Sequence, residues 1–231
     1  MKSQPESVER RAAFRLPALL LSGALLFWLS GCADSRPSGS RVEPAGGVSV
    51  EPTEAELLLE IERKFENPTA HYELGRLYHR SQQWSKAEYH YNVALGFDPA
   101  QRGAQAGMVK MFTDRGETAK AEQYANSYIG APGMDGIESV RLAWEFERLG
   151  LDAQAIRCFR QALARAPDSY EVNKQVGFYY LGKGDDAKAK EHLQRSFELN
   201  PRQPEVAGAL GRLGVVVESP EAPPMTMEKQ P

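Results

Sequence analysis

Small and apolar residues recur along the chain at a fixed interval. Four alanines mark this interval of about 34 residues: Ala87, Ala121, Ala155 and Ala189. An aromatic ring lies nine positions before each alanine, at Tyr78, Phe112, Phe146 and Tyr180. Such a period indicates supersecondary units that stack and share one core. Four blocks follow one another without a gap, at residues 68–101, 102–135, 136–169 and 170–203.

Each block contains two apolar stretches with the spacing of an amphipathic helix. Gly116, Gly150 and Gly184 separate the two stretches in the later blocks, whereas Gln82-Gln83-Trp84 stands there in the first. Pro99 follows the second stretch and is expected to end its helix, because proline has no N–H and disfavours helix in the residue before it. The pattern therefore predicts an all-α chain built from helix pairs.

The residues at these positions resemble those of the tetratricopeptide repeat, whose period is about 34 residues. The first block carries the set Leu74-Gly75, Tyr78, Ala87, Tyr91, Ala94 and Pro99, and the third and fourth blocks repeat most of it. The resemblance implies a right-handed superhelical solenoid of antiparallel helix pairs, with four repeats plus capping helices. Gly75 and Gly177 are expected to let paired helices approach closely. The second block departs from the pattern at Val109, Tyr128 and Gly133.

The two ends of the repeat array need capping elements, because stacked pairs leave an apolar face at each end. Residues 53–67 predict an N-terminal capping helix, with apolar Leu57, Leu58, Ile61 and Phe65. Residues 204–217 predict a C-terminal capping helix, since Gly214 falls where a further repeat would need an aromatic residue. Residues 218–231 contain four prolines and predict a disordered tail.

The first 31 residues have the features of an export signal. Four basic residues precede a run of fourteen uncharged residues at positions 16–29, which is shorter than a membrane-spanning helix requires. The run ends in Leu29-Ser30-Gly31-Cys32, which resembles the lipobox of bacterial lipoproteins. That resemblance implies a signal peptide at 1–31 and a Cys32 that carries lipid, including palmitate, and becomes the first residue. An ordinary secretory leader with a chance cysteine is the alternative.

Residues 32–52 predict the lipidated cysteine and a flexible tether, because Pro, Gly and Ser fill half of positions 33–52. A coil of this length reaches about 25 Å. The resemblance therefore places the folded part at the periplasmic side of a membrane in the cell envelope. Ala33 directly after Cys32 favours the outer membrane over the inner one.

Charge and cysteine content narrow the function classes. The chain has 231 residues and a formal charge of −3, which becomes −5 without residues 1–31. An acidic chain is a poor nucleic-acid binder, so we expect no nucleic-acid partner. If Cys32 carries lipid, Cys158 is the one remaining thiol, and no internal disulfide can form. We expect Cys158 to be packed in the core, with an exposed thiol as the alternative.

Motifs for catalysis, cofactors or metals are weak. Residues 177–184 match a phosphate-binding loop until Gly184, where that loop needs Ser or Thr. His90 and His192 occupy equivalent repeat positions, but metal binding between them would need further ligands. We therefore predict no cofactor, no metal and no enzymatic activity, with an enzyme site built across the repeats as a remote alternative.

The family resemblance also predicts a peptide-binding groove lined by the first helix of each pair. Among the residues that its position pattern selects, nine are basic or aromatic and are predicted to form the groove: Tyr72, Arg76, His79, Arg80, Lys110, Trp144, Arg148, Lys174 and Phe178. Cations mixed with aromatic rings favour a protein partner, peptide or helix, that bears carboxylates and a large apolar side chain. In the alternative, Trp144 and Phe178 contact the C-terminal cap and Arg76 is only solvated.

These features together predict a membrane-anchored, non-catalytic scaffold for protein–protein interaction. By architecture it resembles lipoproteins that assist assembly of a cell-envelope complex such as a pilus or a secretin. Lipoproteins that recruit cell-wall hydrolases have the same architecture and remain the alternative. The sequence does not indicate an oligomeric state.

Overall fold

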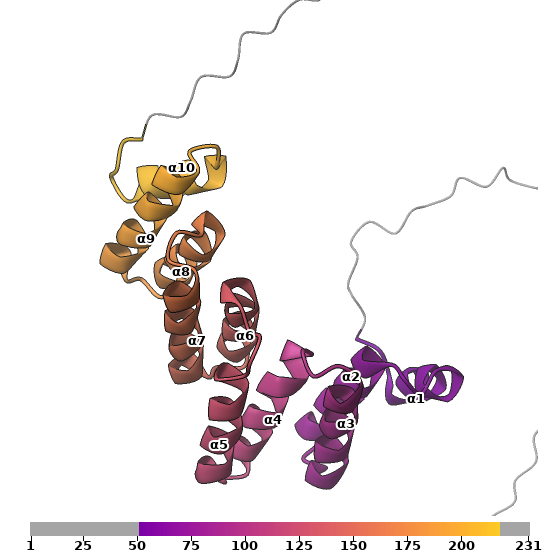
Figure 1. Cartoon of the computed structure of the whole chain (residues 1–231). Coiled ribbons are helices and arrows are strands. Elements are labelled where there is room, and N and C mark those ends of the chain that lie inside the picture. Colours follow the sequence, from indigo (N-terminus) through magenta and orange to yellow (C-terminus); the bar gives the residue numbers. More distant parts are fainter. Residues whose placement is uncertain (1–50, 218–231) are drawn as a thin grey trace, which may run out of the picture. The chain divides into compact units, whose positions relative to one another are not determined.

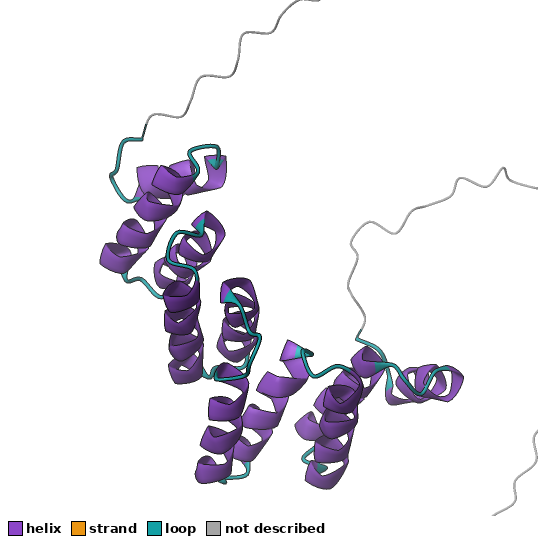
Figure 2. Ribbon diagram, in the orientation of Figure 1, coloured by secondary structure: helices purple, strands orange, loops and turns teal. Residues whose placement is uncertain are grey.

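A computed structural model describes residues 51–217, and these residues form ten helices and no strands (Figures 1 and 2). The helices are α1 (Glu54–Arg63), α2 (Pro68–Arg80), α3 (Trp84–Phe97), α4 (Arg102–Asp114), α5 (Thr118–Ile129), α6 (Gly136–Arg148), α7 (Asp152–Arg165), α8 (Tyr170–Gly182), α9 (Asp186–Leu199) and α10 (Pro204–Arg212). The predicted signal peptide, Cys32, the tether as far as residue 50 and the tail at 218–231 lie outside the described residues.

The helices pack as successive pairs along the chain (Figure 1). The pairs α2–α3, α4–α5, α6–α7 and α8–α9 make the most extensive contacts. The first helix of each pair also contacts the first helix of the next, so α2, α4, α6 and α8 form one continuous layer. This arrangement confirms the predicted all-α repeat solenoid. The second block forms its pair, α4–α5, despite its departures from the repeat pattern.

Glycine allows close helix contacts within the pairs. A Cβ atom added at Gly75 would lie 2.7 Å from Cδ1 of Tyr91, and one at Gly177 would lie 2.7 Å from Cγ of Leu193. Distances this short are repulsive, so no larger residue fits without displacing its neighbour. The predicted role of these two glycines is confirmed.

The turns within the pairs share one backbone conformation. Gly116, Gly150 and Gly184 have φ values of 78°, 71° and 75°. Gln82 occupies the equivalent place in the first pair and has φ 57°. A residue with a Cβ is strained in this left-handed region, so the first turn forms at a cost that the other three avoid.

A buried polar residue recurs at the fourth position of each block. The set is His71, Gln105, Ser139 and Asn173, which are spaced at the same interval as the alanines. The amide of Gln105 donates to the carbonyl of Pro99, and that of Asn173 donates to the carbonyl of Pro167, at 2.7 and 2.9 Å. These bonds give loop carbonyls a side-chain donor, and they attach each pair to the loop before it.

Helices α1 and α10 are the two capping helices of the array. Helix α1 ends at Arg63, before the predicted end of its segment at residue 67, and Asn67 instead caps α2 by accepting from the N–H of Ala70. Pro68 accounts for the extended conformation of Asn67, since the residue before proline avoids the helical region. Helix α10 packs Val206, Ala209 and Leu210 in a cluster with Leu193 of α9.

Candidate functional site

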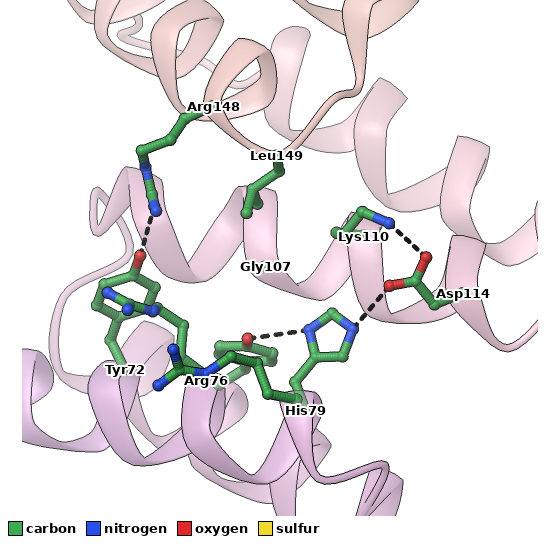
Figure 3. A pocket seen from close by; sticks show the side chains of 10 residues that line it. Tyr72, Arg76, His79, Gly107, Lys110, Asp114, Arg148 and Leu149 are labelled. Carbon is green, nitrogen blue, oxygen red and sulfur yellow. Dashed lines mark hydrogen bonds and ion pairs between the residues drawn. The ribbon is translucent and has the colours of Figure 1, made fainter. Parts of the chain in front are cut away.

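A pocket of about 270 Å³ lies among the first helices of the first three pairs (Figure 3). Its walls come from α2, α4 and the end of α6, and Tyr91 of α3 also lines it. The lining residues are Tyr72, Arg76, His79, Arg80, Tyr91, Gly107, Lys110, Asp114, Arg148 and Leu149. The pocket therefore combines two tyrosine rings, four basic side chains and one carboxylate.

Six of the nine residues predicted for the groove line this pocket: Tyr72, Arg76, His79, Arg80, Lys110 and Arg148. They are brought together although 76 positions separate Tyr72 from Arg148. The pocket also contains Asp114, which the sequence analysis did not select. Asp114 lies one repeat period from both Arg80 and Arg148, so the repeat spacing alone could have identified it.

The small residues of α4 create the space for the pocket. A Cβ at Gly103 would lie 2.6 Å from Cζ of Tyr72, and one at Gly107 would lie 2.7 Å from Cζ of Tyr91. Both tyrosine rings therefore press directly on the backbone of α4. Because α4 has no bulky side chain here, Arg148 of α6 reaches past it, and its Nη2 donates to the hydroxyl of Tyr72 at 2.7 Å (Figure 3).

Carboxylates balance the basic side chains of the pocket. Arg148 is paired with Glu145 at 2.6 Å, and Lys110 is paired with Asp114. Arg76 is paired with Glu73 at 2.9 Å, and both Arg76 and Arg80 contact Glu51, which precedes α1. A ligand carboxylate must compete with these pairs, and mostly exposed pairs of this kind are weak.

Two hydrogen bonds of His79 link pocket residues that come from different helices (Figure 3). Its Nδ1 lies 3.3 Å from the hydroxyl of Tyr91, and its Nε2 lies 3.1 Å from Oδ2 of Asp114. Burial lowers the pKa of His79, against the opposing effect of Asp114, so the ring is neutral at pH 7. The neutral ring donates a hydrogen bond from Nε2 to Asp114 and accepts one at Nδ1 from the hydroxyl of Tyr91. These two bonds fix the orientation of all three groups.

The other three predicted groove residues lie elsewhere. Trp144 donates from Nε1 to Gln175 at 3.0 Å and packs edge-on against Phe159 and Tyr179. Lys174 is paired with Glu171 and Glu205. Phe178 packs against the apolar cluster that contains α10. Two of these side chains thus contribute to packing between neighbouring helices.

The remaining chemical candidates are engaged in the core. Cys158 is fully buried, and burial raises the pKa of its thiol to about 12, so it is an inert packed residue. His90 contacts His71, with their Nδ1 atoms 3.0 Å apart, and His192 faces Asn173. Between residues 51 and 217, no three His, Cys, Asp or Glu side chains form a group that could hold a metal.

The pocket suits reversible binding of an acidic ligand with an aromatic or aliphatic part. Arg and Lys bind carboxylates through charge-assisted hydrogen bonds. Leu149 and the slightly exposed ring of Tyr72 offer an apolar surface, whereas Tyr91 is fully buried. Burial raises the pKa of Tyr91 and that of Tyr72, so both hydroxyls act at neutral pH as hydrogen-bonding groups.

No helix within the described part of the chain is both long and apolar enough to cross a membrane.

Comparison with known proteins identifies the repeat type. Residues 140–169 match the family model of the tetratricopeptide repeat, and they fall within the third predicted block. No curated protein sequence matches the chain.

Solved structures with similar helix arrangements include three proteins of low sequence identity. YrrB, a TPR protein with an unusual peptide-binding site, is 16% identical with a TM-score of 0.36, over 68% of this chain and 81% of that one. The PilF protein of Pseudomonas aeruginosa is 21% identical with a TM-score of 0.36, over 66% and 69%. TTC0263, a TPR protein of Thermus thermophilus, is 15% identical with a TM-score of 0.40, over 69% and 87%.

The assignment of the fold rests on the helix pairs themselves and on the family match at the third pair. The chain is therefore an all-α solenoid of helix pairs that contains a tetratricopeptide repeat at residues 140–169.

Proposed function

We propose that this chain is a non-catalytic scaffold that binds a segment of a partner protein in the pocket between α2, α4 and α6. The observation that supports this most is the convergence of Tyr72, Arg76, Arg80 and Arg148 on one pocket. Tyrosine and arginine are the residues that most often dominate binding energy at protein interfaces. The pocket is also too small for a folded domain, so the bound part is a short segment.

The partner segment carries at least one carboxylate and one large apolar side chain. The carboxylate binds the basic side chains of the pocket, and the apolar side chain contacts Leu149 and the ring of Tyr72. Because salt screens the attraction between the acidic segment and these basic side chains, binding weakens at high salt. An extended or a helical segment can satisfy these contacts.

The cellular setting in this proposal comes from the N-terminal residues. Cys32 carries lipid, and the tether holds the solenoid at the periplasmic side of the outer membrane. There the scaffold assists assembly of an envelope complex such as a pilus or a secretin. The identity of a captured partner would separate this role from recruitment of a cell-wall hydrolase.

Site-specific crosslinking tests the pocket. A photo-crosslinking amino acid in place of Leu149, which lines the pocket, should capture a protein partner in cell envelopes. The same amino acid in place of Glu191, an exposed residue of α9, is the control and should not capture it. Charge reversal of Arg76 and Arg148 together should reduce capture, whereas reversal of exposed Arg160 and Arg212 should not. Equal capture from Leu149 and Glu191 would place the partner outside the pocket.

Lipid labelling tests the anchor separately. With radioactive palmitate in growing cells, the wild-type chain should become labelled, and a Cys32→Ala chain should remain an unlabelled precursor. Label in the Cys32→Ala chain, or none in the wild type, would reject the lipid anchor and leave the pocket proposal intact.

A further inference from the structure

One carboxylate of the chain already occupies the basic entrance of the pocket. Glu51 lies two residues before Thr53, the N-cap of α1, and each of its carboxylate oxygens contacts a different arginine. Oε1 accepts from Nη2 of Arg76 at 2.7 Å, and Oε2 accepts from Nη1 of Arg80 at 2.6 Å. Arg76 and Arg80 are one helical turn apart on α2, so their guanidinium groups form a single fork for one carboxylate.

Neighbouring contacts hold the segment that carries Glu51 against α2. Thr53 and Glu56 form a capping box at the start of α1, with the backbone N–H of Thr53 donating to Glu56 at 2.8 Å. The hydroxyl of Tyr78 donates to Glu54 at 2.7 Å, which attaches the first turn of α1 to α2. Glu51 is therefore kept close to the two arginines and returns to them whenever it leaves, at a high effective concentration.

We propose that Glu51 is an intramolecular competitor for the carboxylate of the partner segment and that the partner displaces it from Arg76 and Arg80. This inference rests on the proposed function, since it assigns the fork as the carboxylate subsite of the same pocket. The competitor lowers affinity and sharpens selection, because a partner without a carboxylate at the matching position cannot displace it.

The exposure of Glu51 makes displacement feasible. Its side chain is 54% exposed, and ion pairs this exposed to water are weak. Arg80 depends on it more than Arg76 does. Among residues 51–217, Glu51 is the one carboxylate that pairs with Arg80, whereas Arg76 also contacts Glu73. Arg80 is therefore the group that displacement of Glu51 makes available to a ligand.

A pair of matched variants tests competition. The probe is a fluorescein-labelled hexapeptide with two glutamates and one tryptophan, and its Kd for the purified full chain in detergent is measured by anisotropy. Glu51→Gln should tighten binding by about threefold, because it removes a weak competitor. Glu54→Gln makes the same charge change three residues away and keeps a side-chain oxygen that accepts from Tyr78, so it should leave the Kd unchanged. Equal effects of the two variants would overturn the proposal, since they would reflect net charge alone.

Arg80→Gln completes the cycle. In its presence the gain from Glu51→Gln should become smaller, because only Arg76 of the fork remains. An undiminished gain would overturn the assignment of the fork. The second readout is the carboxyl carbon resonance of Glu51 followed through a pH titration. The hydrogen bond from Arg80 lowers the pKa of Glu51, so Arg80→Gln should raise that pKa. An unchanged pKa would show that Glu51 does not occupy the fork and would also overturn the proposal.

The competitor role and the proposed function fail in different ways. If no form binds the peptide, the competitor role is overturned. The proposed function fails only if crosslinking from Leu149 also captures no protein.

Discussion

Backbone strain at a single residue distinguishes the first helix pair from the others. Gln82 has a left-handed φ of 57° where the equivalent residue of each later pair is glycine. The left-handed conformation costs a residue with a Cβ about 1–2 kcal/mol relative to its preferred regions. The three glycines show that the turn geometry itself is common to all pairs, so the cost is a property of residue 82.

Gln82→Gly should therefore stabilise the chain by about 0.5–1 kcal/mol, because relief of strain exceeds the greater entropy of glycine in the unfolded state. Urea unfolding followed by circular dichroism measures this change. Gln123→Gly, at an exposed site within α5, is the control and should destabilise by a similar amount. A loss of stability in Gln82→Gly would show that the left-handed conformation is not strained here.

A buried histidine pair gives the first helix pair a pH dependence. Nε2 of His71 lies 3.0 Å from the carbonyl oxygen of Phe65, so it carries a proton and donates. Nδ1 of neutral His71 then accepts from Nδ1 of His90, 3.0 Å away. A proton added to Nδ1 of His71 would bring two N–H groups face to face. Burial, with His71 and Lys86 contributing, lowers the pKa of His90 to about 4, and burial also lowers that of His71.

The sign of the effect follows from where each state binds protons. In the unfolded chain both rings take up protons near pH 6.5, whereas in the folded chain His90 does so only near pH 4 and the pKa of His71 is also lowered. The free energy of unfolding should thus be highest above pH 6.5 and fall as the pH decreases toward 4, by about 1–2 kcal/mol for this partly exposed pair. Chemical unfolding at several pH values measures the slope. His90→Gln, which hydrogen-bonds without titrating, should have a shallower slope, and an identical slope would contradict the assignment.

At the scale of one element, the polar residue at the fourth position of each block attaches a helix pair to the loop before it. Asn173 illustrates this attachment, since its Nδ2 donates to the carbonyls of Pro167 and Ser169, both at 2.9 Å. The side chain is 3% exposed, so water does not replace these bonds. The same position is the point where a hydrophobic pattern fails to predict burial, because the residue there is always polar.

Asn173→Ala should destabilise the fourth pair by about 0.5–1.5 kcal/mol, since it removes the side-chain hydrogen bonds to the carbonyls of Pro167 and Ser169. Thermal unfolding followed by circular dichroism measures the loss, and Gln123→Ala on exposed α5 serves as the control with little effect. If the Asn173→Ala chain is as stable as the wild type, the loop carbonyls have found other donors.

At the scale of the whole molecule, the sequence predicts the helix pairs well because contacts between them recur with the chain period. The repeat period places Gly75 against Tyr91 and Gly177 against Leu193, and a regular solenoid needs little more. The pocket is harder to predict because its members depend on neighbours. Phe178 has the position of a groove residue, yet its ring packs against the apolar cluster that contains residues of α10.

The contribution of Glu51 could not be predicted at all. It belongs to a segment of tether composition, and its contact with Arg80 spans 29 positions outside the repeat frame. Asp114, in contrast, follows from the repeat spacing once position 13 of every block is considered. The difference shows that repeat periodicity predicts what the repeats contribute and gives no information about segments that precede them.

A solenoid also predicts how stability is distributed, because each pair packs mainly against its neighbours. Helix α10 covers Phe178 and Leu181 of the fourth pair through Val206, Ala209 and Leu210. A chain that ends at Gln203 exposes this apolar surface, at a cost on the order of 3 kcal/mol. Hydrogen exchange should then show a large loss of protection in α8 and α9, a smaller loss in α6 and α7, and little change in α2 and α3. A chain that ends at Val217 retains α10 and is the control. Equal loss in all four pairs would mean that the solenoid unfolds as one cooperative unit, and in that case ligand binding at the first three pairs would stabilise the distant α10 as strongly as the pocket itself.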